Sequence, residues 1–149
     1  MIEIKQMSAS GIDFLIGNEG LVLHPYLDTV KVATIGVGST YYEDNTRVKM
    51  TDPTITKLRA IELFKFTLKH YEMAVYSNTR DNINKNQFDA LVSFAYNVGV
   101  NGFKNSTLLK RINSNASDQS IKNGFMMWTK NKELIGRRTR EVKLFFTLV

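Results

Sequence analysis

The spacing of apolar residues changes from a helical to a strand period within the first fifty positions of the chain. Over residues 10–19, Ile12, Leu15 and Ile16 recur at intervals that place them on one helical face. Ser10 stands where a capping side chain is expected. The pattern therefore predicts a short helix that starts at Ser10 and buries one face.

Three short stretches typical of strands follow this helix, at residues 21–27, 33–37 and, with a weaker pattern, 47–50. Turn-forming residues separate them near positions 29–32 and 43–46. The region therefore predicts a small three-stranded antiparallel sheet.

From residue 56 onward, apolar residues recur only at helical intervals. Asn84 and Gln87 form a capping-box pattern that opens one helix, and Gly99 is the natural stop of that helix. Before it, a long helix is predicted over residues 56–77, with an apolar stripe made of Ile61, Phe64, Leu68, Tyr71 and Val75.

The last third of the chain predicts a loop over residues 101–107, with Asn105 or Ser106 capping the helix that follows. A further helix is predicted over about residues 118–128. The final helix is predicted to begin after Gly136, with one stripe made of Val142, Phe145, Phe146 and Val149.

Together these elements predict an α+β fold in a single domain, residues 1–149. A lobe of roughly residues 10–55 holds the three-stranded sheet, and a larger helical lobe covers roughly residues 78–149. The helix at residues 56–77 joins the two lobes.

The composition, with 43% hydrophobic and 23% charged residues, is that of an ordinary globular chain. No apolar run approaches the length of a membrane span, and the first residues lack the basic and apolar blocks of a signal peptide. We therefore expect a protein that is made in the cytoplasm and does not insert stably into a membrane. The chain has no cysteine and two separated histidines, so we expect no disulfide, no metal and no cofactor.

The net charge of +6 indicates attraction to polyanions. Nucleic acid and an anionic bacterial envelope both fit, and charge alone does not choose between them. The basic residues are spread along the chain, so no disordered basic arm is predicted.

The candidate chemistry is concentrated between residues 18 and 40. Glu19 ends the first predicted helix, Asp28 follows in the strand-like stretch, and Thr34 opens the glycine-punctuated run TIGVG. Two carboxylates that face one gap from different elements are the minimum equipment for cleaving a glycosidic bond. Such a pair alone is more often solvated surface, and it is the order of helix end, Tyr-x-Asp and Thr-Ile-Gly-x-Gly that favours a catalytic site.

This motif closely resembles the catalytic signature of bacteriophage-type lysozymes, glycoside hydrolase family 24, in the spacing of Glu19, Asp28 and Thr34. The resemblance continues through ALVSFAYNVG, GFKNSTLLKRIN, the segment around Trp128 and GRRTREVKLF, and it implies a lysozyme-like fold and activity. The residues that flank the triad match as well: Gly20, Tyr26, Ile35, Gly36 and Gly38.

The resemblance also implies a role for each residue. Glu19 would protonate the leaving oxygen, Asp28 would stabilise oxocarbenium charge or help activate water, and Thr34 would position that water. It implies the inverting geometry, in which roughly 6.5–9.5 Å between the carboxyl groups admits the water. Tyr96 and Ser106 match positions that line the saccharide cleft, and a core or capping role is the alternative for each.

One of Arg137 and Arg138 is expected near Glu19, as a family arginine is, and the alternative is that both lie on the surface. Two positions depart from the family pattern. Many members have glycine at Lys31, where a positive φ would cost lysine about 1 kcal/mol, and many have histidine at Ser39. Neither departure removes a catalytic group, so we expect activity.

The sequence therefore predicts a peptidoglycan hydrolase that cuts the β-1,4 bond between N-acetylmuramic acid and N-acetylglucosamine in glycan strands. We expect a monomer that binds no nucleic acid. The implied setting is a phage endolysin, or a prophage copy, that stays in the host cytoplasm until a separately made membrane pore releases it to lyse the cell.

Two alternatives stay open at this point. A lytic transglycosylase would use the same glycan and an acid/base glutamate but no water-holding partner, so Asp28 and Thr34 argue against it. A non-catalytic basic module that binds the wall or nucleic acid would not need the intact triad.

Overall fold

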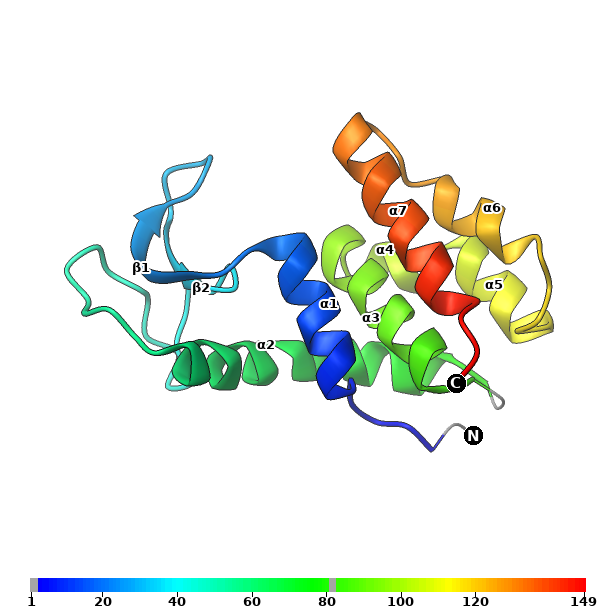
Figure 1. The fold of residues 1–149 in the computed structure, drawn as a ribbon, viewed down its shortest axis with the longest axis horizontal. Coiled ribbons are helices and arrows are strands. Elements are labelled where there is room, and N and C mark those ends of the chain that lie inside the picture. Colours follow the sequence, from blue (N-terminus) through cyan, green and yellow to red (C-terminus); the bar gives the residue numbers. More distant parts are fainter. Residues whose placement is uncertain (1–2, 81–82) are drawn as a thin grey trace. The chain divides into compact units, whose positions relative to one another are not determined.

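The computed structural model describes residues 3–80 and 83–149, which form seven helices and one two-stranded antiparallel sheet (Figure 1). The fold is α+β, as predicted. No helix in these ranges is both long and apolar enough to cross a bilayer. In chain order the elements are α1 (Ala9–Glu19), β1 (Val22–Leu27), β2 (Ala33–Gly36), α2 (Lys57–Asn78), α3 (Lys85–Val98), α4 (Val100–Lys104), α5 (Thr107–Ser114), α6 (Ile121–Met126) and α7 (Lys132–Phe145).

The chain forms two compact units. Unit 2 is Asp13–Lys69, and unit 1 combines Met1–Ile12 with His70–Val149. The two lobes and the joining helix that the sequence suggests stay a prediction.

Helix α1 covers Ala9–Glu19, in agreement with the helix predicted over residues 10–19, but Ser8 caps it, so the predicted cap at Ser10 is wrong. The Ser8 hydroxyl accepts a hydrogen bond from the Gly11 N–H at 3.0 Å. It also donates to the Asp89 carboxylate at 2.6 Å, and burial raises the pKa of that carboxyl. A Cβ on Gly11 would lie 2.3 Å from Asp89 Cγ, so this position requires glycine.

Strands β1 and β2 pair with an irregular register. Val22 pairs with Gly36, and Tyr26 pairs with Thr34. Four steps along β1 therefore face two steps along β2, and β1 bulges between the two pairs. Because of this bulge, Val22 at the start of β1 lies opposite a residue that is two positions from Thr34.

The third strand predicted at residues 47–50 is wrong. This segment makes one isolated bridge, between Tyr41 and Arg47, within the described part of the chain. Asn45 has a φ of 70°, and the Asp44 side chain accepts hydrogen bonds from inside the same turn. The polar turn is therefore tight, and the two arms are too short to extend the sheet.

The core of unit 2 lies between β2 and α2. Ile35, Val48 and Leu63 form its buried cluster. Gly36 has a φ of +69°, and a Cβ there would lie 3.4 Å from the Ala60 Cβ. Glycine at this position therefore lets β2 turn away while it packs closely against α2.

In unit 1, capping side chains set the start of two helices. The predicted capping box of Asn84 and Gln87 is present at the start of α3. Helix α7 starts at Lys132 because the Asn131 side chain accepts from the Leu134 N–H at 2.9 Å. The predicted start after Gly136 is therefore wrong, and this glycine lies inside the helix.

Other boundaries in unit 1 also differ from the prediction. The predicted loop is partly helical, since α4 forms where Phe103 is fully buried and packs edge-on against Phe94. The helix predicted near residues 118–128 is shorter, and α6 covers Ile121–Met126. Val149 is 75% exposed, so it does not belong to the buried stripe of α7.

The buried face of α7 carries charge. Arg137, Arg138 and Glu141 are all buried, so the alternative that both arginines lie on the surface is wrong. Glu141 accepts from Arg138 at 2.5 Å, from Arg137 Nε at 3.2 Å and from the Ser93 hydroxyl at 2.6 Å. Helix α3 is therefore joined to α7 by an ion cluster as well as by apolar contacts.

Arg138 is fixed on every side of its guanidinium. It donates to the Trp128 carbonyl at 3.1 Å and to the Asn97 side chain, and it lies over the Phe94 ring with 5.0 Å from Cζ to the centroid. Burial lowers its pKa. Glu141 therefore supplies the negative charge that balances the buried guanidinium groups.

Replacing Glu141 with alanine should lower the free energy of unfolding by about 3–5 kcal/mol, because buried arginines lose their shared carboxylate. Urea denaturation measures this change. Glu133→Ala, at the exposed start of the same helix, is the matched control and should cost less than about 1 kcal/mol. Equal losses in the two variants would contradict this account of the cluster.

Candidate active site

Asp28 closes the turn between β1 and β2. Its Oδ1 accepts hydrogen bonds from the Val30 N–H at 2.9 Å and the Val32 N–H at 2.8 Å. Within the described ranges, every hydrogen bond to this carboxylate goes to Oδ1. The side chain is partly exposed, so Oδ2 can bind a group from outside the protein.

Thr34 and Asp28 both form side-chain hydrogen bonds to the backbone of Val32. Its side chain is buried, and Oγ1 donates to the Val32 carbonyl at 2.9 Å. Because this hydrogen bond uses the hydroxyl proton, Thr34 can only accept a hydrogen bond from a further group. The Val32 backbone therefore brings Asp28 and Thr34 together, which no side-chain pattern in the sequence indicates.

Glu19 is the last residue of α1, and Gly20 turns the chain toward β1. Gly20 has a φ of 87°, and its N–H donates to the Ile16 carbonyl at 2.7 Å. This is the left-handed helix end that glycine favours. The Glu19 side chain is partly buried.

The sheet register relates Glu19 to Thr34. Strand β1 starts three residues after Glu19, at Val22, which pairs with Gly36. Thr34 lies two residues from Gly36 along β2, which corresponds to about 7 Å. The end of α1 and Thr34 are therefore near the same part of the ladder, while the carboxylate separation stays a prediction.

Lys31 occupies the left-handed region, with a φ of 63°. The turn therefore keeps the conformation that glycine prefers, and lysine costs about 1 kcal/mol there. Its N–H donates to the Asp28 carbonyl at 3.0 Å. The expected departure at Lys31 thus changes the energy of the turn and adds a positive charge three residues from Asp28.

Ser39, the second departure, pairs with Ile35 through two backbone hydrogen bonds of 2.9 and 3.0 Å. Its side chain is buried, and Oγ has no hydrogen-bond partner in the described part of the protein. Residues directly opposite each other in an antiparallel pair project to the same face. Ser39 therefore projects with Ile35 toward the core, on the face opposite to Thr34.

Tyr96 and Ser106 belong to unit 1. Ser106 caps α5, accepting from the Leu109 N–H at 3.0 Å and donating to the Phe103 carbonyl at 2.7 Å. This is the capping role that the sequence left open. Tyr96 is partly buried, and its ring packs edge-on against Tyr71 at 5.0 Å. Substrate contacts by either residue stay a prediction.

Arg137 and Arg138 also belong to unit 1, whereas Glu19 belongs to unit 2. The expectation that one of these arginines lies near Glu19 stays a prediction.

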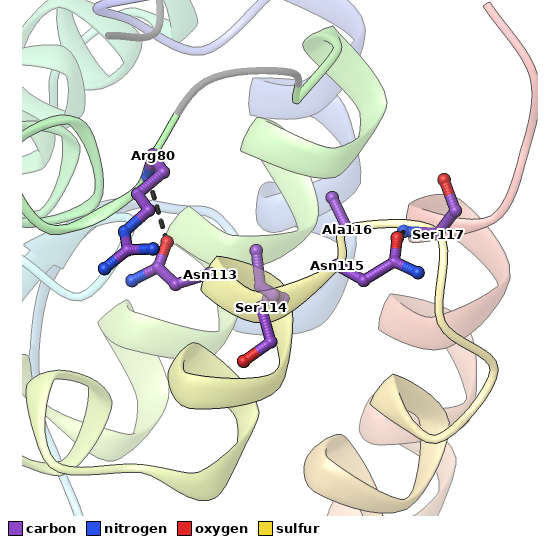
Figure 2. A pocket seen from close by; sticks show the side chains of 7 residues that line it. Arg80, Asn113, Ser114, Asn115, Ala116 and Ser117 are labelled. Carbon is purple, nitrogen blue, oxygen red and sulfur yellow. Dashed lines mark hydrogen bonds between the residues drawn. The ribbon is translucent and has the colours of Figure 1, made fainter.

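A polar pocket in unit 1 lies at the end of α5 (Figure 2). Its volume is about 440 Å³, and the Arg80 N–H donates to the Asn113 side chain at 2.9 Å at its edge. None of the predicted site residues lines this pocket, which is formed by Arg80, Ile112, Asn113, Ser114, Asn115, Ala116 and Ser117.

The family model named phage lysozyme matches residues 17–141 of this chain. The endolysin of Salmonella phage P22 is 37% identical over 148 residues, which are 97% of this chain and 100% of that protein. The endolysin of Bacillus phage PZA is 33% identical over 94% of this chain, which spans 55% of that longer protein.

Solved structures of related enzymes are also similar to this chain over nearly its whole length. An endolysin from Escherichia coli O157:H7 phage FAHEc1 has a TM-score of 0.91 at 28% identity, covering 100% of this chain and 98% of its own. P22 lysozyme has a TM-score of 0.87 at 36% identity, covering 97% and 100%. The muramidase domain of SpmX from Asticaccaulis excentricus has a TM-score of 0.82 at 27% identity, covering 97% and 100%.

Two variants separate the turn-forming role of Asp28 from its charge. Asp28→Asn keeps an oxygen that can accept both turn N–H groups, so its free energy of unfolding should stay within about 0.5 kcal/mol of the parent value. Asp28→Ala removes both hydrogen bonds and should cost about 1–2 kcal/mol. Urea unfolding of the three proteins measures the difference, and equal stability of the two variants would contradict the role of Oδ1.

Proposed function

This chain belongs to the phage lysozyme family of glycoside hydrolases, and we propose that it cleaves the β-1,4 bond between N-acetylmuramic acid and N-acetylglucosamine in peptidoglycan. The observation that carries the proposal is the shared attachment of Asp28 and Thr34 to the Val32 backbone. This attachment holds the Asp28 carboxylate and the Thr34 hydroxyl to one residue, and Glu19 precedes the strand that pairs with β2.

Glu19 is the proposed general acid. Its carboxyl proton passes to the glycosidic oxygen as the bond from that oxygen to the anomeric carbon of N-acetylmuramic acid breaks. The N-acetylglucosamine portion leaves as an alcohol, and positive charge develops on the muramic acid ring. The Asp28 carboxylate stabilises this charge.

A water molecule completes the reaction on the opposite face of the ring. Thr34 accepts one of its hydrogen bonds, since its own proton is held by the Val32 carbonyl. Asp28 Oδ2 accepts the other and takes the proton as the water oxygen bonds to the anomeric carbon. This arrangement inverts the configuration at that carbon, and it uses no metal or cofactor.

The proposed setting is the lysis of a bacterial host by a phage or prophage enzyme. The supporting observation is that the similar proteins reported above are phage endolysins. In this setting the protein acts as a monomer on glycan strands and does not bind nucleic acid. It stays in the host cytoplasm until a separate pore gives it access to the wall.

Glu19→Gln should lower the rate of wall hydrolysis by at least about 100-fold, because the amide cannot donate the proton. Binding to insoluble peptidoglycan, measured by co-sedimentation, should stay within about twofold of the parent, since the side chain keeps its shape. A Glu19→Gln variant that clears cells as fast as the parent would contradict the proposed role of Glu19.

Thr34→Val should reduce kcat by about 100-fold, because the attacking water loses its hydrogen-bond acceptor and its position. The Val32 carbonyl keeps its hydrogen bond from the Asp28 N–H at 3.0 Å, so the turn should survive. Thr34→Ser retains the hydroxyl and is the matched control. Full kcat in the valine variant would show that Thr34 does not position the water.

A further inference from the structure

The tip of the turn between β1 and β2 exposes a lysine in a backbone conformation that lysine disfavours. Lys31 and Asn45 are the non-glycine residues with positive φ in the described ranges, at 63° and 70°. Asparagine tolerates this region because its short side chain bonds locally, whereas lysine has no such compensation. A strained residue at a functional site is a reason to look for a role of its side chain.

The Lys31 side chain projects into solvent. It is exposed, and it forms no ion pair with any residue in the described part of the chain. Val30, beside it, is 74% exposed. The tip therefore presents one cation and one aliphatic side chain that nothing in unit 2 covers.

Hydrogen bonds hold this tip in a fixed relation to Asp28. The Val30 N–H donates to Asp28 Oδ1 at 2.9 Å, and the Lys31 N–H donates to the Asp28 carbonyl at 3.0 Å. The backbone of both residues is therefore held to the residue that is assigned to the reaction. Lys31 therefore projects from a backbone that is fixed three residues from the carboxylate assigned to the reaction.

We propose that Lys31 is a specificity-determining residue, whose ammonium group binds a carboxylate on the peptide stem of the glycan substrate. This inference rests on the proposed function. In peptidoglycan the stem is attached to the muramic acid unit, next to the scissile bond. The stem has free carboxylates and small aliphatic side chains, which complement Lys31 and Val30.

The test compares two forms of one substrate: peptidoglycan with free stem carboxylates, and the same material after these are converted to neutral amides. The enzyme variants are Lys31→Asn, which keeps the left-handed turn without charge, and Lys31→Arg, which keeps the charge. Lys57→Asn removes an equal charge from an exposed position in unit 2 and is the matched control. Release of reducing ends gives kcat/KM for each combination.

Lys31→Asn should lower kcat/KM on the carboxylate form by about 3–10-fold, the range for a partly solvated charged hydrogen bond. It should have the same kcat/KM as the parent on the amidated form. Lys31→Arg should retain at least half of the parent value on both forms. Lys57→Asn should change kcat/KM by less than about twofold on either, since Lys57 is exposed to screening salt and is assigned no contact with the substrate.

Lys31→Gly adds a second readout. It should raise the melting temperature by about 2–4 °C, through relief of backbone strain, while losing the same discrimination between the two substrates. The turn would then be more stable and the enzyme less selective.

Two outcomes overturn the proposal. Equal loss on both substrate forms would mean that Lys31 acts on the turn rather than on the stem. No loss on either form would mean that the ammonium group binds nothing in the reaction. If the parent protein releases no reducing ends from either form, the proposed function fails, and that result is distinct from both.

Discussion

The backbone of Val32 is the constraint on which the proposed active site depends. Its N–H fixes one oxygen of Asp28, and its carbonyl takes the hydroxyl proton of Thr34. In the proposed mechanism, the second carboxylate oxygen of Asp28 and the hydroxyl oxygen of Thr34 accept hydrogen bonds from the attacking water. The same turn carries Lys31, so the groups proposed to activate water and to select substrate share one rigid scaffold. Glu19 ends α1, and the bulged strand that follows it pairs with the strand of Thr34, while the distance from Glu19 to Asp28 stays a prediction.

Local signals in the sequence predicted much of this arrangement. The α+β class, the C-terminal end of α1, the approximate span of α2 and the capping box at Asn84 follow from periodicity and capping chemistry. The resemblance to phage lysozymes supplied Glu19, Asp28 and Thr34. The match to the phage lysozyme family model and to phage endolysins shows that the chain belongs to this family. The sequence could not supply the Val32 link, because an apolar residue acting through its peptide groups leaves no side-chain pattern.

Several of the wrong predictions share a physical cause, which is that contacts distant in sequence override local preference. Asp89 selects Ser8 as the cap of α1, and burial of Phe103 turns a polar, loop-like segment into α4. The buried pairing of Glu141 makes α7 a helix with a charged interior face. The third strand failed for the opposite reason, since the polar turn around Asn45 satisfies its own backbone groups before a ladder can extend.

The most direct test of the account is mass spectrometry of peptidoglycan digested by the protein in oxygen-18 water. If Asp28 and Thr34 deliver water to the anomeric carbon, the released muropeptides will have reducing ends that contain one oxygen-18 atom. Unlabelled anhydro-muropeptides would mean transglycosylation and would remove the water-handling role from both residues. Absence of any released fragment from several wall types would contradict the assignment of this site as a peptidoglycan hydrolase.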